Sequence, residues 1–216
     1  MRCVVLVVCA LVLSACSQTT AGKPQGVVSD SPKAGTSTSG GDSTLQERIS
    51  WVQAGNSIDL GAYHSARTDN GPATDLKTDI AFVSPTGKIS CITGVAHNIE
   101  GFDCEVELKQ PVPQPREGYG NWFGGFVSYS GQRLTVGQFR GDPGLFINGS
   151  GQTLPYDSTV TFENYACRLA TTGLTCVNPA ERTGVHMSDE GIVPFGCLQE
   201  VPESEREPSV GHAYRC

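Results

Sequence analysis

The sequence lacks the short motifs that mark the common catalytic and metal sites. It contains neither Gly-x-Ser-x-Gly, which holds a serine nucleophile on a strained turn, nor His-Glu-x-x-His. It has no Cys-x-x-Cys pair, and its four histidines, at positions 64, 97, 186 and 212, show no ligand spacing. We therefore predict no catalytic residue, no metal site and no cofactor. A site assembled from residues distant in the chain would leave no such motif, so a hydrolase with a non-obvious active site remains the alternative.

Basic residues are also scarce. The chain has 15 Lys and Arg against 22 Asp and Glu, which gives a formal net charge of −7. Nucleic acids and anionic membrane patches are bound through clustered Lys and Arg, so this balance predicts no nucleic-acid partner. It leaves cell-wall polymers, small molecules and other proteins as partner classes.

No apolar run reaches the roughly 20 residues that a membrane-spanning helix needs. The run at residues 4–13 would form only ~15 Å of helix; it follows Arg2 and ends in Leu13-Ser14-Ala15-Cys16. A basic start, a short apolar stretch and small residues before a cut are typical of an export signal, here residues 1–15. Leu13 to Cys16 resembles the lipobox of bacterial lipoproteins. This resemblance implies that Cys16 becomes the acylated N-terminus, which anchors the protein on the outer face of the plasma membrane.

Residues 16–43 have the composition of a flexible tether. Seventeen of the 27 residues from 17 to 43 are Ser, Thr, Gly or Pro, a composition that buries too little apolar surface to order itself. As a coil the segment would reach ~30 Å from the lipid. Its Ser and Thr clusters leave two alternatives open, a plain linker and a glycosylated one.

The folded part is predicted to be one extracytoplasmic β-rich domain at residues 44–216. Thr44-Leu45-Gln46-Glu47 fits a capping box, and apolar spacing predicts a helix from there to about Ala54. Short β-prone runs separated by turn residues follow it, too closely spaced for alternating strands and helices. The sequence thus predicts a mainly β fold, a small antiparallel sheet or sandwich with one flanking N-terminal helix.

The domain's cysteines predict a disulfide framework. Six remain once the signal and Cys16 are set aside, and an even number in an exported domain indicates disulfides. Successive strand candidates carry the first four, so we predict pairing between sequence neighbours, with the last pair assigned by elimination. The predicted bridges are Cys91 with Cys104, Cys167 with Cys176, and Cys197 with Cys216.

Residues 119–129 are the most distinctive segment of the domain, because they alternate aromatic residues with glycines. Such rings can present flat faces to a sugar, with Tyr119, Trp122 and Tyr129 as candidate binding residues. An ordinary core strand gives the same pattern, and large aromatics are more often buried, so we favour the core interpretation. For Asp103, Glu105 and Glu107, which alternate with core positions, a solvated strand face is favoured over a Ca²⁺ site.

The chain resembles the uncharacterised Lpp-type lipoproteins of mycobacteria and related actinobacteria (LppI-like). The resemblance is carried by the lipobox, the run Phe82-Val83-Ser84-Pro85-Thr86-Gly87-Lys88-Ile89-Ser90-Cys91 and the hairpin that ends in Gly173-Leu174-Thr175-Cys176-Val177-Asn178. The family's turn reads Ser-Pro-Ser-Gly-Asn, so Thr86 and Lys88 are departures that alter the surface of this hairpin. The resemblance implies an envelope location and no established activity. We expect a non-catalytic domain that binds an envelope protein or a cell-wall glycan.

The lipobox yields a prediction about Cys16. Cys16→Ala removes the thiol that would carry the lipid, so the protein should be released from the membrane or accumulate as an unprocessed precursor. Membrane fractionation with detergent extraction measures this. Normal maturation and detergent-dependent retention of the variant would contradict the lipid anchor.

Overall fold

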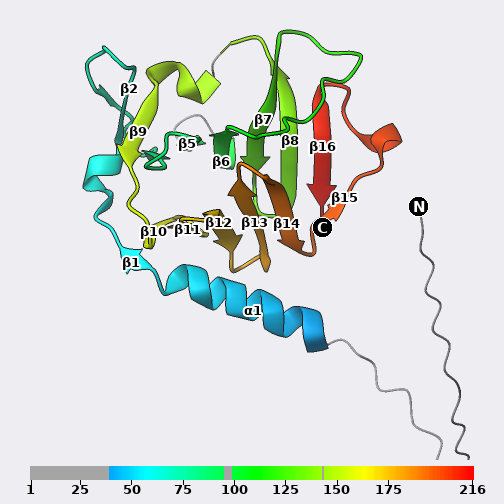
Figure 1. Ribbon diagram of the computed structural model, residues 1–216, viewed down its shortest axis with the longest axis horizontal. Coiled ribbons are helices and arrows are strands. Elements are labelled where there is room, and N and C mark those ends of the chain that lie inside the picture. The colour runs from blue at the N-terminus through cyan, green and yellow to red at the C-terminus, as the bar shows by residue number, and fades with distance from the viewer. Residues whose placement is uncertain (1–38, 95–98, 143) are drawn as a thin grey trace, which may run out of the picture. The chain divides into compact units, whose positions relative to one another are not determined.

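The computed structural model describes residues 39–94, 99–142 and 144–216. It contains one α-helix, α1 (Ser39–Gln53), followed by strands that form two sheets, as Figure 1 shows. Within the described residues, three short 3-10 helices interrupt the strands: η1 (Leu60–Tyr63), η3 (Gly144–Asn148) and η4 (Glu203–Glu205). The predicted mainly β class with an N-terminal helix is confirmed.

The smaller sheet has six strands and is antiparallel except at one edge, where β1 runs parallel to β10. From β10 to β14 each strand pairs with the next one along the chain, so the sheet is a meander of tight hairpins. Its order is β1 (Asn56–Ser57), β10 (Ser158–Phe162), β11 (Tyr165–Ala170), β12 (Gly173–Asn178), β13 (Thr183–Ser188) and β14 (Gly191–Gly196).

The larger sheet has ten strands, of which several at its two edges are only two or three residues long. Its centre is the meander from β4 to β8, which the C-terminal strand β16 extends by pairing with β8. Its order is β15 (Gln199–Glu200), β16 (Val210–Arg215), β8 (Arg133–Arg140), β7 (Asn121–Tyr129), β6 (Ile99–Val106), β5 (Ile89–Gly94), β4 (Ala81–Val83), β9 (Ser150–Thr153), β2 (Ser65–Arg67) and β3 (Thr74–Asp75).

The core lies between the two sheets and is centred on Phe102 in β6. Its ring meets Tyr129 of the same sheet edge-on, with centroids 5.6 Å apart. It meets Phe162 and Tyr165 of the smaller sheet in the same way, at 5.5 and 5.6 Å. Edge-to-face contacts at these distances add to the hydrophobic contribution of burial. The domain is thus a sandwich whose two sheets interlock through aromatic side chains.

Helix α1 packs on the outer face of the smaller sheet. Leu45, Ile49 and Val52 fall at the spacing of one helical face and contact Ala166 and Val177. The helix starts at Ser39, five residues before the predicted start, so residues 39–43 belong to it and not to a tether. The helix thus includes Gly40 and Gly41, although glycine has a low helix propensity. No helix in the described residues is long and apolar enough to cross a membrane.

The three predicted disulfides are present. Cys91–Cys104 joins β5 to β6 and Cys167–Cys176 joins β11 to β12, both at directly opposed positions of a hairpin. All four of these cysteines are buried in the core between the sheets. The third bridge, Cys197–Cys216, is exposed and ties the end of the smaller sheet's last strand to the C-terminus of β16.

The exposed bridge gives a stability prediction. The double substitution Cys197→Ser with Cys216→Ser should lower the free energy of unfolding by about 3 kcal/mol, because it reopens a 19-residue separation in the unfolded chain without leaving a cavity in the core. Guanidinium unfolding of the wild type and the variant under non-reducing conditions measures this difference. Coincident unfolding midpoints would show that the bridge contributes nothing.

Candidate functional site

The turn between β4 and β5, residues 84–88, is held rigidly by its own hydrogen bonds. The amide of Gly87 donates to the Ser84 carbonyl (2.9 Å), and the amide of Ile89 donates to Ser84 Oγ (3.1 Å). The hydroxyls of Ser84 and Thr86 lie 3.1 Å apart. Gly87 has φ +75°, a conformation that favours glycine. The turn therefore presents the Lys88 side chain from a fixed backbone.

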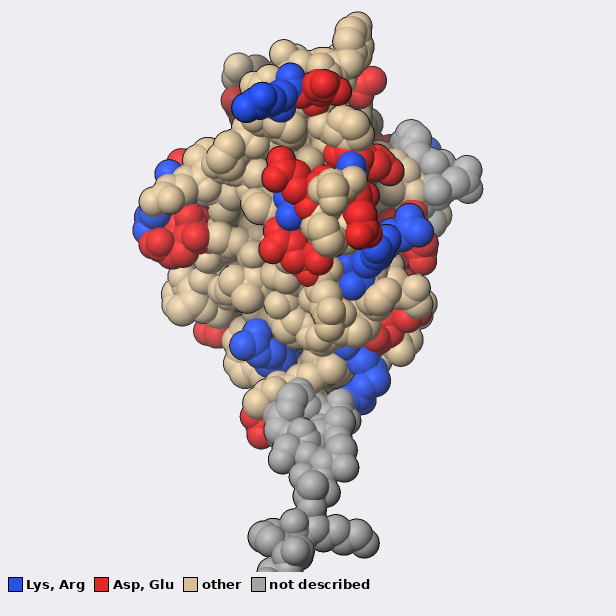
Figure 2. Space-filling view, turned by 90° about the vertical axis from the view of Figure 1, so that its right-hand side faces the viewer, with Lys and Arg blue, Asp and Glu red and all other residues tan. Residues whose placement is uncertain are grey.

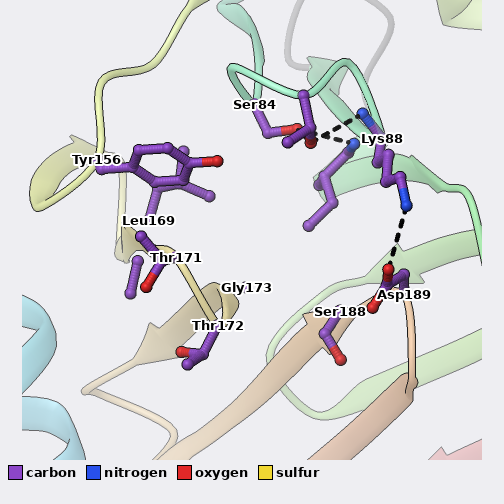
Figure 3. A pocket seen from close by; sticks show the side chains of 12 residues that line it. Ser84, Lys88, Tyr156, Leu169, Thr171, Thr172, Gly173, Ser188 and Asp189 are labelled. Atoms are coloured by element: carbon purple, nitrogen blue, oxygen red, sulfur yellow. Dashed lines mark hydrogen bonds and ion pairs between the residues drawn. The ribbon is translucent and has the colours of Figure 1, made fainter.

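A cavity of about 140 Å³ lies beneath this turn, where turns of the two sheets meet. Figure 3 shows the ring of Tyr156 on one side of it and Lys88 on the other. Most of the polar groups around it are hydroxyls, and Leu169 and Ile89 supply apolar surface. The lining hydroxyl side chains are Ser84, Thr86, Thr171, Thr172, Ser188 and Tyr156. We call it the hydroxyl cavity.

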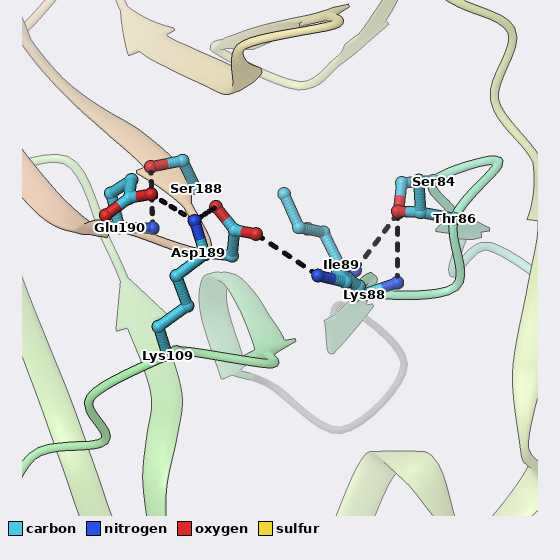
Figure 4. A network of polar contacts seen from close by, with 8 residues as sticks. All are labelled: Ser84, Thr86, Lys88, Ile89, Lys109, Ser188, Asp189 and Glu190. Carbon is cyan, nitrogen blue, oxygen red and sulfur yellow. Dashed lines mark hydrogen bonds and ion pairs between the residues drawn. The ribbon is translucent and has the colours of Figure 1, made fainter.

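An ion-pair network joins the two sheets at the mouth of the hydroxyl cavity (Figure 4). Lys88 Nζ lies 3.1 Å from Asp189 Oδ2, and Lys109 Nζ lies 3.6 Å from Asp189 Oδ1 and also pairs with Glu190. The hydrogen bond from Lys88 and the charge of Lys109 hold the pKa of Asp189 below its usual value. The hydrogen bond to Glu190 raises the pKa of Lys109. Both shifts favour the charged forms of Asp189 and Lys109 at neutral pH.

Lys88 also lines a second hollow, a groove of about 430 Å³ along the larger sheet. Its floor is Gly124 and Gly125, at the point where the register of β7 against β8 shifts. A Cβ on Gly125 would lie 1.9 Å from the carbonyl oxygen of Val106, so no other residue fits there without displacing the backbone. The half-exposed ring of Phe123 flanks these glycines. We call this hollow the glycine groove.

Ser90, Glu105 and Ser150 supply polar oxygens to the glycine groove. The carboxyl of Glu105 is half-buried, and burial raises its pKa, an effect that the nearby guanidinium of Arg140 partly opposes. The groove thus combines a flat backbone floor and one aromatic ring with several hydrogen-bonding groups. This is the composition of a site for a polar ligand with flat faces.

The three aromatic residues proposed from the sequence do not form a common surface. Trp122 packs edge-on against Phe139, with centroids 5.1 Å apart, and its indole N–H donates to the Val112 carbonyl (2.9 Å). Tyr129 is fully buried, and its hydroxyl lies 2.7 Å from Thr183 Oγ1. Only Tyr119 is exposed, at 90%. The burial of Tyr129 agrees with the favoured core interpretation, and its alternative assignment as a binding residue is wrong, because its position in β7 faces the aromatic core.

The interpretation of Asp103 as a solvated residue is also wrong. Its side chain is buried, and its Oδ2 lies 3.8 Å from Arg140 Nη1. The guanidinium in turn lies over the ring of Phe126, 4.2 Å from its centroid. Burial raises the pKa of Asp103, which hydrogen bonding and the charge of Arg140 oppose. The alternation along β6 correctly placed Asp103 on the face opposite the core cysteines. That face is nevertheless covered by residues about 40 positions later in the chain. They include Phe146, whose ring meets that of Phe126 edge-on.

The acidic stretch near the C-terminus is held by ion pairs. Figure 2 shows the acidic side chains gathered on the face that carries β15, η4 and β16, with basic groups among them. Arg206 donates to the carbonyls of Val201 and Gly211 and to Glu200 Oε1, at 2.7 to 2.8 Å. His212 Nδ1 lies 2.9 Å from the same Glu200 oxygen. These contacts account for the shape of the segment without a ligand.

The described histidines do not gather beside a carboxylate pair in a cleft. His64 Nδ1 lies 2.9 Å from the backbone carbonyl of Asp79. His186 Nδ1 lies 2.9 Å from Thr175 Oγ1, and burial lowers its pKa, so it is neutral at pH 7. His97 falls outside the described residues. Among those residues, no group of three or more His, Cys, Asp or Glu is arranged to hold a metal ion.

Comparison with known proteins identifies no relative. No protein family matches the chain, and no curated protein or solved structure shows significant similarity to it. The resemblance to Lpp-type lipoproteins therefore stays a prediction. The case for function depends on the geometry of the hydroxyl cavity and the glycine groove.

Trp122 gives a test of the core interpretation. Trp122→Ala should lower the free energy of unfolding by about 3 kcal/mol, because it removes the ring that fills the space beside Gly137, Phe139 and Gly211. Tyr119→Ala is the matched control and should change stability by less than about 0.5 kcal/mol. Thermal melting of both variants measures this. An unchanged melting temperature for Trp122→Ala would overturn the structural role.

Proposed function

We propose that this protein is a lipid-anchored component of the cell envelope whose β-sandwich binds a cell-wall glycan without catalysing a reaction. Anchorage is proposed from the sequence features that end at Cys16. Binding is proposed from one observation, the hydroxyl cavity, in which hydroxyl groups surround a small space closed on one side by the Tyr156 ring.

The chemistry of the hydroxyl cavity suits a sugar ring. Hydroxyl side chains donate and accept hydrogen bonds at the same atom, as the hydroxyls of a sugar do. Tyr156, 37% exposed, offers a flat face that would pack on the C–H side of a pyranose. Lys88 and Asp189 add a donor and an acceptor, charged groups whose hydrogen bonds are about twice as strong as neutral ones.

The balance of charge around the hydroxyl cavity also favours a hydroxylated ligand over a strongly charged one. Two lysines face one aspartate and one glutamate, and these four groups pair with one another. A polyanion would have to break those pairs. The acidic chain as a whole points the same way, since a net charge of −7 repels a polyanion.

Tyr156→Ala tests the proposal. The affinity of the full-length protein for purified cell-wall polysaccharide should fall at least about fivefold, the equivalent of about 1 kcal/mol of lost ring contact. Tyr119→Ala removes an exposed tyrosine that lines neither hollow and should leave the affinity unchanged. Co-sedimentation with the insoluble polysaccharide measures both variants.

Three outcomes would count against this function. Equal binding by Tyr156→Ala and wild type would remove the hydroxyl cavity as the site. Failure of the wild type to bind any wall polysaccharide, together with capture of one envelope protein after crosslinking, would replace the glycan with a protein partner. New reducing ends released from the polysaccharide would show the alternative function, an envelope hydrolase.

A further inference from the structure

The hydroxyl cavity is too small for more than one unit of a polymer. Its volume of about 140 Å³ is less than half of the ~300 Å³ at which pockets for small-molecule ligands usually begin. A cell-wall glycan that places one ring there must continue along the protein surface or leave it. The direction in which the next units would lie therefore depends on what adjoins the mouth of the cavity.

The glycine groove adjoins it through Lys88, whose side chain lines both hollows and is 40% exposed. The two hollows lie on either side of one rigid turn, since Ser84 and Thr86 face the hydroxyl cavity and Gly87 faces the glycine groove. A backbone hydrogen bond also joins Lys88 to the residue that follows β6: the amide of Glu107 donates to the Lys88 carbonyl (2.8 Å).

We propose that the hydroxyl cavity and the glycine groove are consecutive subsites for one linear glycan, which passes Lys88 between them. This inference rests on the proposed function and extends it from a single sugar to a chain. Tyr156 contacts the unit in the hydroxyl cavity, and Phe123 contacts a unit in the glycine groove. The close contact of Gly125 with the Val106 backbone keeps β7 tight against β6 at the base of the groove.

Lys88 is suited to the position between the subsites. Its ammonium has three N–H donors, one of which is directed at Asp189 Oδ2. The other donors are available to oxygens of the glycan on the exposed side. Asp189 also pairs with Lys109, so it keeps one cationic neighbour if Lys88 turns partly toward the ligand. Lys109 itself lines neither hollow, which makes it the natural control.

The experiment compares short and long soluble fragments of purified wall polysaccharide, titrated calorimetrically into the full-length protein. Long fragments should bind at least about tenfold more tightly than single sugar units, because only the long fragments can occupy both subsites. Phe123→Ala should reduce the affinity for long fragments to that for single units and leave the binding of single units unchanged. Tyr156→Ala should weaken both. Ile147→Ala, at an exposed apolar position outside both hollows, should change neither.

Lys88→Ala and Lys109→Ala form the second comparison. Each substitution removes one ion pair to Asp189. If the network has only a structural role, the two substitutions should therefore change the glycan affinity to a similar extent. The two-subsite path predicts that only Lys88→Ala weakens binding of both fragment classes, by at least about fivefold. A melting curve for each variant identifies any loss of folding, and Lys88→Arg, which keeps the donors, should restore most of the affinity if folding is intact.

The outcomes separate this inference from the proposed function. Equal affinity for short and long fragments, with Phe123→Ala binding as wild type does, would overturn the two-subsite path and leave the hydroxyl cavity as a single-sugar site. Equal loss from Lys88→Ala and Lys109→Ala would also overturn the path. Absence of binding by fragments of any length would overturn both.

Discussion

The contact of Phe102 with Phe162 and Tyr165 is the interaction on which the rest of this structure depends. It is the place where the larger sheet interlocks with the smaller one, and Tyr129 supports the same ring from within the larger sheet. Because aromatic rings in this arrangement have defined distances and angles, they set the spacing between the sheets as well as stabilising it. The hydroxyl cavity lies between turns of the two sheets, so its width follows from this spacing.

The two buried disulfides act within the sheets, and the aromatic core acts between them. Cys91 lies three residues after Lys88, and its bridge to Cys104 fixes β5 against β6. Glu105, the next residue, contributes to the glycine groove. The bridge therefore holds in register two strands that carry lining residues of both hollows. Cys167–Cys176 does the same for the hairpin whose turn supplies Thr171 and Thr172 to the hydroxyl cavity.

The sequence predicted those parts of the structure that depend on local contacts. Alternation and turn residues located the hairpins, and paired strands at short separation gave the disulfide pairing. Strands β13, β14 and β16 have weaker local signals, since β14 contains Pro194 and the other two have a glycine as their second residue. The burial of Asp103 could not be predicted, because it depends on side chains far away in the chain. The hydroxyl cavity was missed for the same reason: Ser84, Tyr156, Thr171 and Asp189 come from four separate segments.

The ion pairs at the mouth of the hydroxyl cavity hold the two sheets together and would also let Lys88 contact the proposed glycan. An exposed lysine that binds a ligand usually gives up its own ion pair, and here that loss would leave Asp189 without a counter-charge between the sheets. Lys109 reduces this cost, because it faces the other oxygen of the same carboxylate, although it shares its single charge with Glu190. Asp189 keeps a cationic neighbour whichever way Lys88 turns. The contact between the sheets is therefore preserved while one of its lysines remains available for recognition.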